Sequence, residues 1–257
     1  MKKVIVISAL AISLCSCSEL LNVASEVAPT VLSSTSTTAI TNTENISGLK
    51  SSLNVGIEKA VSLLGVENGF YNDALLKLLL PEEAQPIVDN IKLIPGGQDL
   101  LNKAVLSLNR SAEDAVKEAT PIFKKSILNM SISDATGILF GANNAATEYL
   151  RKTTYSDLSA AFMPKVKQSL EKPLVANVST NQSWNALTSA YNKVAKSPVG
   201  SVAGLKSISI DLNQYVTEKA LDGLFVKVAA EEKAIRTDPA ARVTTLLQRV
   251  FGQLDKK

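Results

Sequence analysis

From residue 46 onward, apolar side chains recur every three or four positions, which is the spacing of one face of an α-helix. Clear stretches of this kind cover residues 46–64, 98–119, 158–170, 184–194 and 212–236. No run alternates apolar and polar residues beside a turn, and no unit of about 20–50 residues repeats. The pattern predicts an all-α fold, a single bundle of seven to nine helices behind a flexible N-terminal tether.

Local signals predict where several helices begin. Pro81 followed by two glutamates is a typical helix start, and this helix would end at Pro95-Gly96-Gly97. Ser131–Asp134 and Thr154–Asp157 have the spacing of a capping box, so each predicts the start of another helix. Asp238-Pro239 has an N-cap residue followed by a first-turn proline, which predicts the start of the last helix.

Residues 1–17 differ from the rest of the chain, because a lysine pair precedes a short apolar run over residues 4–14. A charged start before an apolar run about half as long as a membrane span is typical of a secretory signal peptide. The run ends in Leu14-Cys15-Ser16-Cys17, which resembles the bacterial lipobox, and Cys17 fits better than Cys15 because a small residue precedes it. The resemblance implies a lipoprotein signal peptide with lipid attached to Cys17; an ordinary cleaved signal with two incidental cysteines is the alternative.

Residues 18–45 are predicted to form the tether. Ten of the thirteen positions from Ser33 to Asn45 are Ser, Thr or Asn, a composition that buries too little apolar surface to offset the entropy of ordering. The helical domain then takes residues 46–257, held to a membrane through acyl chains on Cys17. Ser18 stands where lipoproteins retained at the inner membrane carry aspartate, so the outer membrane, on its periplasmic side, is the expected location.

Composition excludes several kinds of chemistry. The chain has no histidine, which removes Ser-His-Asp and Cys-His catalysis and histidine-ligated metal sites. Cleavage of the signal peptide leaves 25 basic against 24 acidic residues, and no basic block remains that would favour nucleic acid. With Cys15 removed and Cys17 acylated, the domain has no thiol for disulfide or thiolate chemistry. We therefore expect no cofactor, no metal site and no nucleic-acid partner.

Two short motifs resemble catalytic or phosphate-binding sequences but are incomplete. Ser47-Gly48-Leu49-Lys50 has the S-x-x-K spacing of penicillin-binding enzymes, yet neither of the companion motifs follows. We interpret Ser47 as a helix N-cap. Gly200–Ser207 superficially resembles a phosphate loop, but its glycines are one residue too close and Leu205 separates the second glycine from the lysine. A flexible loop is the better interpretation.

Several longer strings are distinctive enough to compare with known families. They are Gly69-Phe70-Tyr71, Leu108–Ala115, Pro121-Ile122-Phe123, Gly137-Ile138-Leu139, Ala145-Ala146-Thr147 with Tyr149 and Arg151, Val216–Phe225 and Glu231–Arg242. Over about residues 46–252 they resemble the bacterial domain-of-unknown-function family 4197 (DUF4197). The resemblance implies a mostly helical, secreted or lipid-anchored envelope protein with no established activity.

One group of charges borders the apolar stripe of the helix predicted over residues 212–236. A 100° step per residue places Glu218, Asp222, Glu232 and Arg236 along the same edge of that stripe. Glu218 and Asp222 are like charges one turn apart, which destabilises a helix unless a cation lies nearby. We expect an arginine–carboxylate network that fixes helix register, with a ligand or a bound cation as the alternative. The arginines that could join it are Arg110, Arg151 and Arg242.

These features leave two classes of function. The favoured one is a lipid-anchored cell-envelope protein with a non-catalytic binding or structural role, whose partner is an envelope protein or a lipid. A lipid-binding helical carrier is a variant of this class. The other class is a periplasmic hydrolase that uses paired carboxylates, the only abundant acid–base groups in the chain. A hydrolase needs carboxylates that face each other in a polar cleft, a carrier needs a large apolar cavity, and a scaffold needs an exposed apolar patch.

Overall fold

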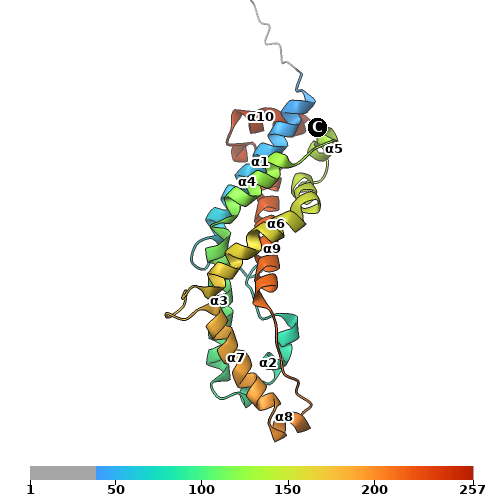
Figure 1. Cartoon of the computed structure of the whole chain (residues 1–257). Coiled ribbons are helices and arrows are strands. Elements are labelled where there is room, and N and C mark those ends of the chain that lie inside the picture. The colour runs from blue at the N-terminus through green and yellow to red at the C-terminus, as the bar shows by residue number, and fades with distance from the viewer. Residues whose placement is uncertain (1–38, 257) are drawn as a thin grey trace, which may run out of the picture. The chain divides into compact units, whose positions relative to one another are not determined.

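A computed structural model of the chain describes residues 39–256, in which ten α-helices and four short 3-10 helices follow one another (Figure 1). The predicted signal peptide, Cys17 and all of the predicted tether before residue 39 lie outside the described residues. No β-strand occurs in the described part, where an isolated bridge joins Val175 and Val178. The predicted all-α class is therefore confirmed. Across residues 39–256, none of the helices combines the length and the apolar character that a membrane span requires.

The helices differ widely in length. The α-helices are α1 (Asn42–Leu64), α2 (Gln85–Asp89), α3 (Gly97–Val116), α4 (Ala119–Asn129), α5 (Ala135–Leu139), α6 (Ala145–Glu171), α7 (Thr180–Ala195), α8 (Pro198–Val202), α9 (Leu212–Thr237) and α10 (Thr245–Phe251). The 3-10 helices are η1 (Glu82–Ala84), η2 (Ile91–Leu93), η3 (Pro239–Ala241) and η4 (Gly252–Lys256). The predicted seven to nine helices correspond to the longer α-helices together with some of the five-residue helices α2, α5 and α8.

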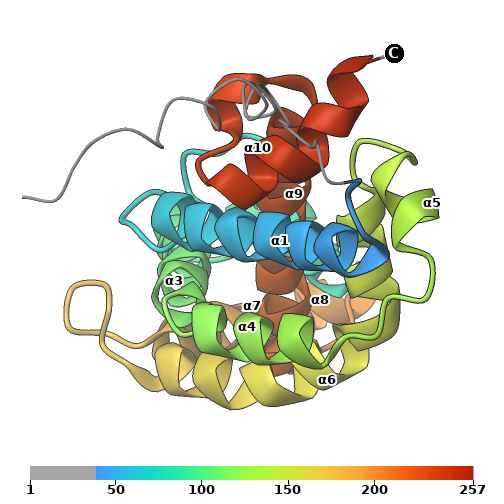
Figure 2. The same cartoon turned by 90° about the horizontal axis from the view of Figure 1, so that it is seen from above.

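Helix α9 is the centre of the packing. It contacts α1, α3, α6 and α10, while α4 lies between α1 and α6, and α7 packs along α3 (Figure 2). The apolar stripe predicted for α9 is buried, so the helical periodicity identified the core face correctly. Its members are Leu221, Leu224, Phe225, Val228 and Ile235. They belong to one apolar cluster that continues from α1 to α10.

Two predictions about helix ends are wrong. Helix α1 starts before residue 46, with Thr41 and Glu44 forming its capping box, so Ser47 lies inside the helix and caps nothing. The helix predicted after Pro81 is divided into η1, α2 and η2. Pro86 near the start of α2 has no N–H group, so the hydrogen-bond ladder of η1 cannot continue into α2.

Three predicted caps are also misplaced. Asp134 caps α5, so the cap is not Ser131. Thr154 lies inside α6, where its hydroxyl donates a hydrogen bond to a carbonyl one turn earlier. Asp238 caps only the short η3, and α10 begins later with Thr244 as its cap. A Ser, Thr or Asp side chain can bond to N–H groups at a helix start or to backbone groups elsewhere, so its presence alone does not mark a start.

Two glycines allow elements to approach closely. A Cβ atom at Gly48 on α1 would lie 2.6 Å from a methyl group of Val250 on α10. A Cβ atom at Gly223 on α9 would lie 2.6 Å from the ring of Phe70, which precedes α2 in the chain. No side chain larger than hydrogen fits either contact without displacing its neighbour. These positions therefore set how closely α10 and the Phe70 loop pack on the long helices.

We expect Gly48→Ala to lower the free energy of unfolding by about 1–3 kcal/mol, because the new methyl group overpacks the contact with Val250. Chemical denaturation of the full chain measures this change. Gly252→Ala is the matched control, since nothing lies within 4 Å of a Cβ atom there. Equal stability of the two variants would show that the α1–α10 contact is looser than the structure indicates.

Candidate functional site

The charged residues singled out from the sequence lie in three separate places, so they do not form one network. The first place is the C-terminal half of α9 and the segment after it, with Glu232, Arg236 and Arg242. The second is the middle of α3, with Arg110. The third is the contact between α6 and α9, with Arg151, Asp222 and, one turn away, Glu218.

Glu232 is a fully buried carboxylate that caps the N-terminus of α6. Its Oε1 atom accepts a hydrogen bond from the N–H group of Ala146 at 3.0 Å. Its Oε2 atom accepts from the N–H group and the hydroxyl of Thr147 at 2.7 and 2.6 Å. The side chain of Asn144, the N-cap residue of α6, makes no such capping hydrogen bond. Glu232 therefore lies in the core, beyond the edge position predicted for it, and satisfies N–H groups that the helix leaves unpaired.

Arg236 neutralises Glu232 and caps a second helix. Its Nε and Nη2 atoms donate hydrogen bonds to Glu232 Oε1 at 2.9 and 2.7 Å. Its Nη1 and Nη2 atoms also donate to the carbonyls of Leu139 and Ile138, at the C-terminal end of α5. One buried ion pair thus joins the end of α5, the start of α6 and the body of α9.

Arg242 closes the C-terminal end of α9 in the same way. It donates hydrogen bonds to the carbonyls of Ile235 and Arg236 and pairs with Asp255 through both terminal nitrogens. The hydrogen bond to Asp255 raises the pKa of Arg242 and lowers the pKa of Asp255, so the pair stays charged over the neutral range. Arg242 therefore fixes the segment that leads into α10.

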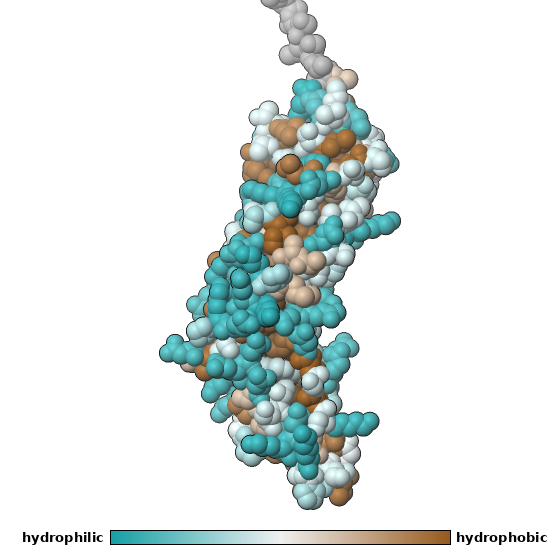
Figure 3. Space-filling view, in the orientation of Figure 1, coloured by the Kyte–Doolittle hydropathy of each residue, from teal (hydrophilic) through white to brown (hydrophobic). Residues whose placement is uncertain are grey.

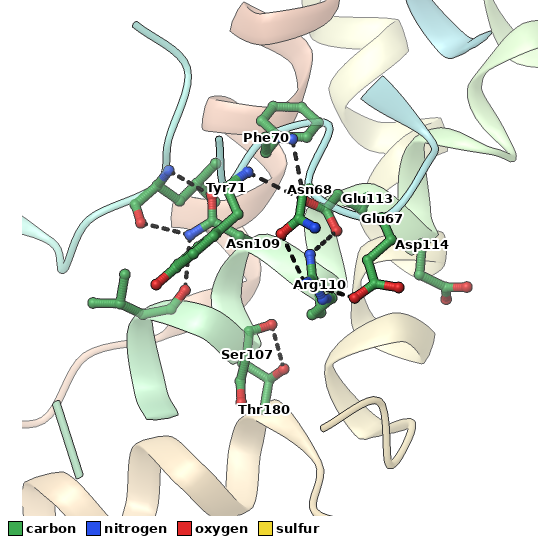
Figure 4. A network of polar contacts seen from close by, with 12 residues as sticks. Glu67, Asn68, Phe70, Tyr71, Ser107, Asn109, Arg110, Glu113, Asp114 and Thr180 are labelled. Carbon is green, nitrogen blue, oxygen red and sulfur yellow. Dashed lines mark hydrogen bonds and ion pairs between the residues drawn. The ribbon is translucent and has the colours of Figure 1, made fainter. Parts of the chain in front are cut away.

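The string around Arg110 fastens the loop before α2 to α3 (Figure 4). Glu113 Oε1 accepts hydrogen bonds from the N–H groups of Phe70 and Tyr71, both at 3.1 Å. Arg110 donates to the other oxygen of Glu113 at 2.6 Å and to Glu67 at 3.1 Å. The partners of Arg110 are therefore on its own helix and on this loop, and α9 supplies none of them.

Asn109 holds the same loop further along. Its side-chain oxygen accepts from the N–H group of Leu78 at 2.9 Å, and its nitrogen donates to the Leu78 carbonyl at 2.8 Å. The amide therefore satisfies both backbone groups of Leu78, which lies outside any helix. On the other side of α3, the hydroxyl of Thr180 on α7 donates to the Ser107 carbonyl at 2.9 Å (Figure 4). The polar residues of the Leu108–Ala115 segment on α3 thus make structural contacts.

The third place holds an ion pair between α6 and α9. Arg151 binds Asp222, and its guanidinium lies 5.2 Å from the centre of the Phe225 ring. Among the three arginines considered for the carboxylates of α9, Arg151 is thus the one that lies beside Asp222. Glu218 accepts a hydrogen bond from Gln214 at 2.9 Å and forms no ion pair within residues 39–256.

Glu218 and Asp222 border a depression of about 590 Å³ that we call the acidic groove. One wall is the chain from residue 75 to 83, and the other is the face of α9 that carries Tyr215 and Val226. Leu75 and Leu79 are 89% and 61% exposed, and Val226 is 45% exposed. The carboxylates of the groove are Glu82, Glu83, Glu218 and Asp222, and its lysines are Lys77 and Lys219.

Tyr215 connects the two walls. Its hydroxyl donates a hydrogen bond to the carbonyl of Leu79 at 2.7 Å. Burial raises the pKa of Tyr215 to about 12, and the negative charges of Glu83 and Glu82 act in the same direction. The hydroxyl is therefore neutral at physiological pH and remains a donor, in surroundings that favour positive charge.

Asp73 fixes the start of the wall formed by residues 75–83, which we call the leucine wall. It accepts a hydrogen bond from Lys227 of α9 at 2.7 Å, and this bond lowers the pKa of the Asp73 carboxyl. Its other oxygen accepts from the N–H groups of Leu75 and Leu76. The turn before the exposed leucines is thus tied to α9 while their side chains stay outside the core.

Sequence reasoning missed the acidic groove. The signal was available, since five of the six residues from Leu75 to Leu80 are leucine and two glutamates follow shortly afterwards. Apolar residues reach the surface at several places on the face seen in Figure 3, so exposure of one leucine means little. The groove stands out because exposed leucines and several carboxylates occur together. Within the described residues, no group of three or more His, Cys, Asp or Glu side chains could hold a metal ion.

A family model described as a protein of unknown function (DUF4197) matches residues 39–252. The match covers every α-helix from α1 to α10. No curated protein matches the chain, and no solved structure matches it. The function therefore has to be inferred from the residues themselves.

We expect Glu232→Gln to lower the free energy of unfolding by about 3–5 kcal/mol, because Arg236 would remain buried without its counter-charge. Thermal and chemical denaturation of the full chain measure the loss. Glu231→Gln, one position earlier on the same helix, is the control and should change stability by less than about 0.5 kcal/mol. If the two variants were equally stable, the capping role of Glu232 would be wrong.

Proposed function

Because the chain belongs to the DUF4197 family of proteins of unknown function, we propose a function from its own geometry: a non-catalytic binding module of the bacterial cell envelope, anchored by lipid on Cys17. The acidic groove is the observation that carries this proposal. It combines exposed Leu75 and Leu79 with a carboxylate rim, and such patches on soluble domains serve as interaction sites.

The positions of the buried charges support a binding role over catalysis. Glu232 accepts bonds from two N–H groups, a hydroxyl and an arginine, and Glu113 accepts from two N–H groups and an arginine. A carboxylate used in this way holds backbone groups in place and has no room to approach a substrate. The most deeply buried acids of the described chain thus serve the fold.

The sequence supports the proposed location. The lipobox resemblance assigns lipid to Cys17, and Ser18 behind it favours the outer membrane, with the domain facing the periplasm. A protein attached in this way carries its groove in the space between the membranes, where partners from the envelope can reach it. The proposed partners are therefore envelope components, and nucleic acid is not among them.

Cells grown with labelled fatty acid are expected to incorporate the label into the wild-type chain and not into Cys17→Ser, because the acyl chains attach at that residue. Gel electrophoresis of the immunoprecipitated chain measures incorporation. Cys15→Ser is the matched control and should be labelled like the wild type. Unchanged labelling of Cys17→Ser would contradict the anchoring.

A photo-crosslinking amino acid at position 79 should give a discrete crosslinked band in living cells, because Leu79 lies at the mouth of the acidic groove. The same amino acid at position 128 is the control, since Leu128 on α4 is similarly exposed at 71% and lies outside the groove. Immunoblots against the chain reveal the bands. Identical patterns at both positions, or no band at position 79, would show that the groove is not a binding surface.

A further inference from the structure

We infer that the acidic groove binds a segment of a partner protein in which leucine-like residues alternate with lysine or arginine. This inference rests on the proposed function and names the chemistry of the partner. Three properties of the groove point to it: exposed apolar side chains, carboxylates without a counter-charge, and backbone donors without a partner.

The apolar part of the groove is large enough to bind more than a single side chain. Leu75, Leu79 and Val226 expose 89%, 61% and 45% of their surface, and they line the same depression of about 590 Å³. Leu79 also borders a second depression of about 480 Å³ on the other side of the leucine wall. The wall is thus a ridge between two hollows, and side chains on one face of an extended segment could enter them.

The charges of the groove favour a basic partner. Glu82, Glu83 and Glu218 form no ion pair within the described residues, although each lies at the rim of the groove. The two lysines of the groove are directed onto tyrosine rings, with Lys77 at 3.9 Å and Lys219 at 5.9 Å from the ring centres. Unpaired carboxylates around an apolar surface attract lysine or arginine and repel anionic lipid headgroups.

The backbone of the leucine wall offers hydrogen-bond donors. Leu78 is held on one side by Asn109, and the carbonyl of Leu79 accepts from Tyr215. The N–H groups of Leu79 and Leu80 have no hydrogen-bond partner among the described residues. A carbonyl group of a bound peptide can accept a hydrogen bond from one of them, since the N–H groups of successive extended residues point to opposite sides.

The test uses a short dye-labelled peptide in which leucine and lysine alternate, so that an extended conformation places all leucines on one face. A second peptide carries glutamate in place of lysine. Fluorescence anisotropy with the purified full chain carrying Cys17→Ser measures binding. The lysine peptide should bind, its affinity should fall as salt is added, and the glutamate peptide should bind at least about tenfold more weakly.

Four variants localise the binding. Leu79→Ala and Glu218→Lys should each weaken binding of the lysine peptide about tenfold, since they remove an apolar contact and reverse a rim charge. Leu128→Ala and Glu171→Lys are the matched controls, with an exposed leucine on α4 and an exposed glutamate at the end of α6, and should bind like the parent chain. Thermal denaturation of all four verifies that they fold.

Several outcomes would overturn the inference. Equal binding of both peptides, or equal effects of the groove and control variants, would show that the groove does not recognise basic apolar segments. Flotation with phosphatidylcholine vesicles that Leu79→Ala abolishes would assign the groove to lipid. A dimer that Leu79→Ala dissociates in sedimentation would assign it to a second copy of the chain. A crosslink at position 79 without peptide binding would leave the proposed function standing and reject only this partner chemistry.

Discussion

The buried pair of Glu232 and Arg236 is the interaction on which the arrangement of the helices depends most. It brings the start of α6 and the end of α5 onto the side of α9, because the two side chains from α9 bind backbone groups of both other helices. A buried pair contributes little stability compared with apolar residues of the same size, but loss of one member leaves a charge in the core. The pair therefore specifies which helix ends meet more than it strengthens their contact.

Other polar side chains likewise join backbone segments elsewhere in the domain. Asn109 and Glu113 bind the backbone of the loop before α2, and Arg242 binds backbone carbonyls at the C-terminal end of α9. In each case a polar side chain satisfies backbone groups that regular secondary structure leaves unpaired. A domain with long helices and irregular connections needs such contacts, because its loops contribute little apolar surface. The distinctive polar residues of this chain thus serve its architecture.

The sequence was sufficient to predict the fold class and most of the long helices, because α1, α3, α7 and α9 each bury one apolar face. In α6 the buried positions are interrupted between Leu150 and Leu158, so the first turns of that helix were missed. It was insufficient for helix starts such as Thr154, since a hydroxyl forms its hydrogen bonds equally well inside a helix. The 100° step per residue placed Glu232 beside the core face but could not show how deeply its side chain is buried. The helix ends that surround Glu232 and Arg236 come from residues about 90 positions away in the chain. For Asp222 the spacing called for a cation, and only the tertiary packing selected Arg151 from three candidates.

Asn109 has a consequence for the speed of recognition. Because its amide holds Leu78 from within, and Tyr215 and Asp73 hold the neighbouring residues, the leucine wall keeps one conformation. A surface ordered in advance loses little conformational entropy when another chain arrives. Association is then limited by diffusion and orientation, without a slow rearrangement before contact, and the lifetime of a complex depends on the surface that it buries. For the binding role proposed above, the ordered wall thus favours fast association.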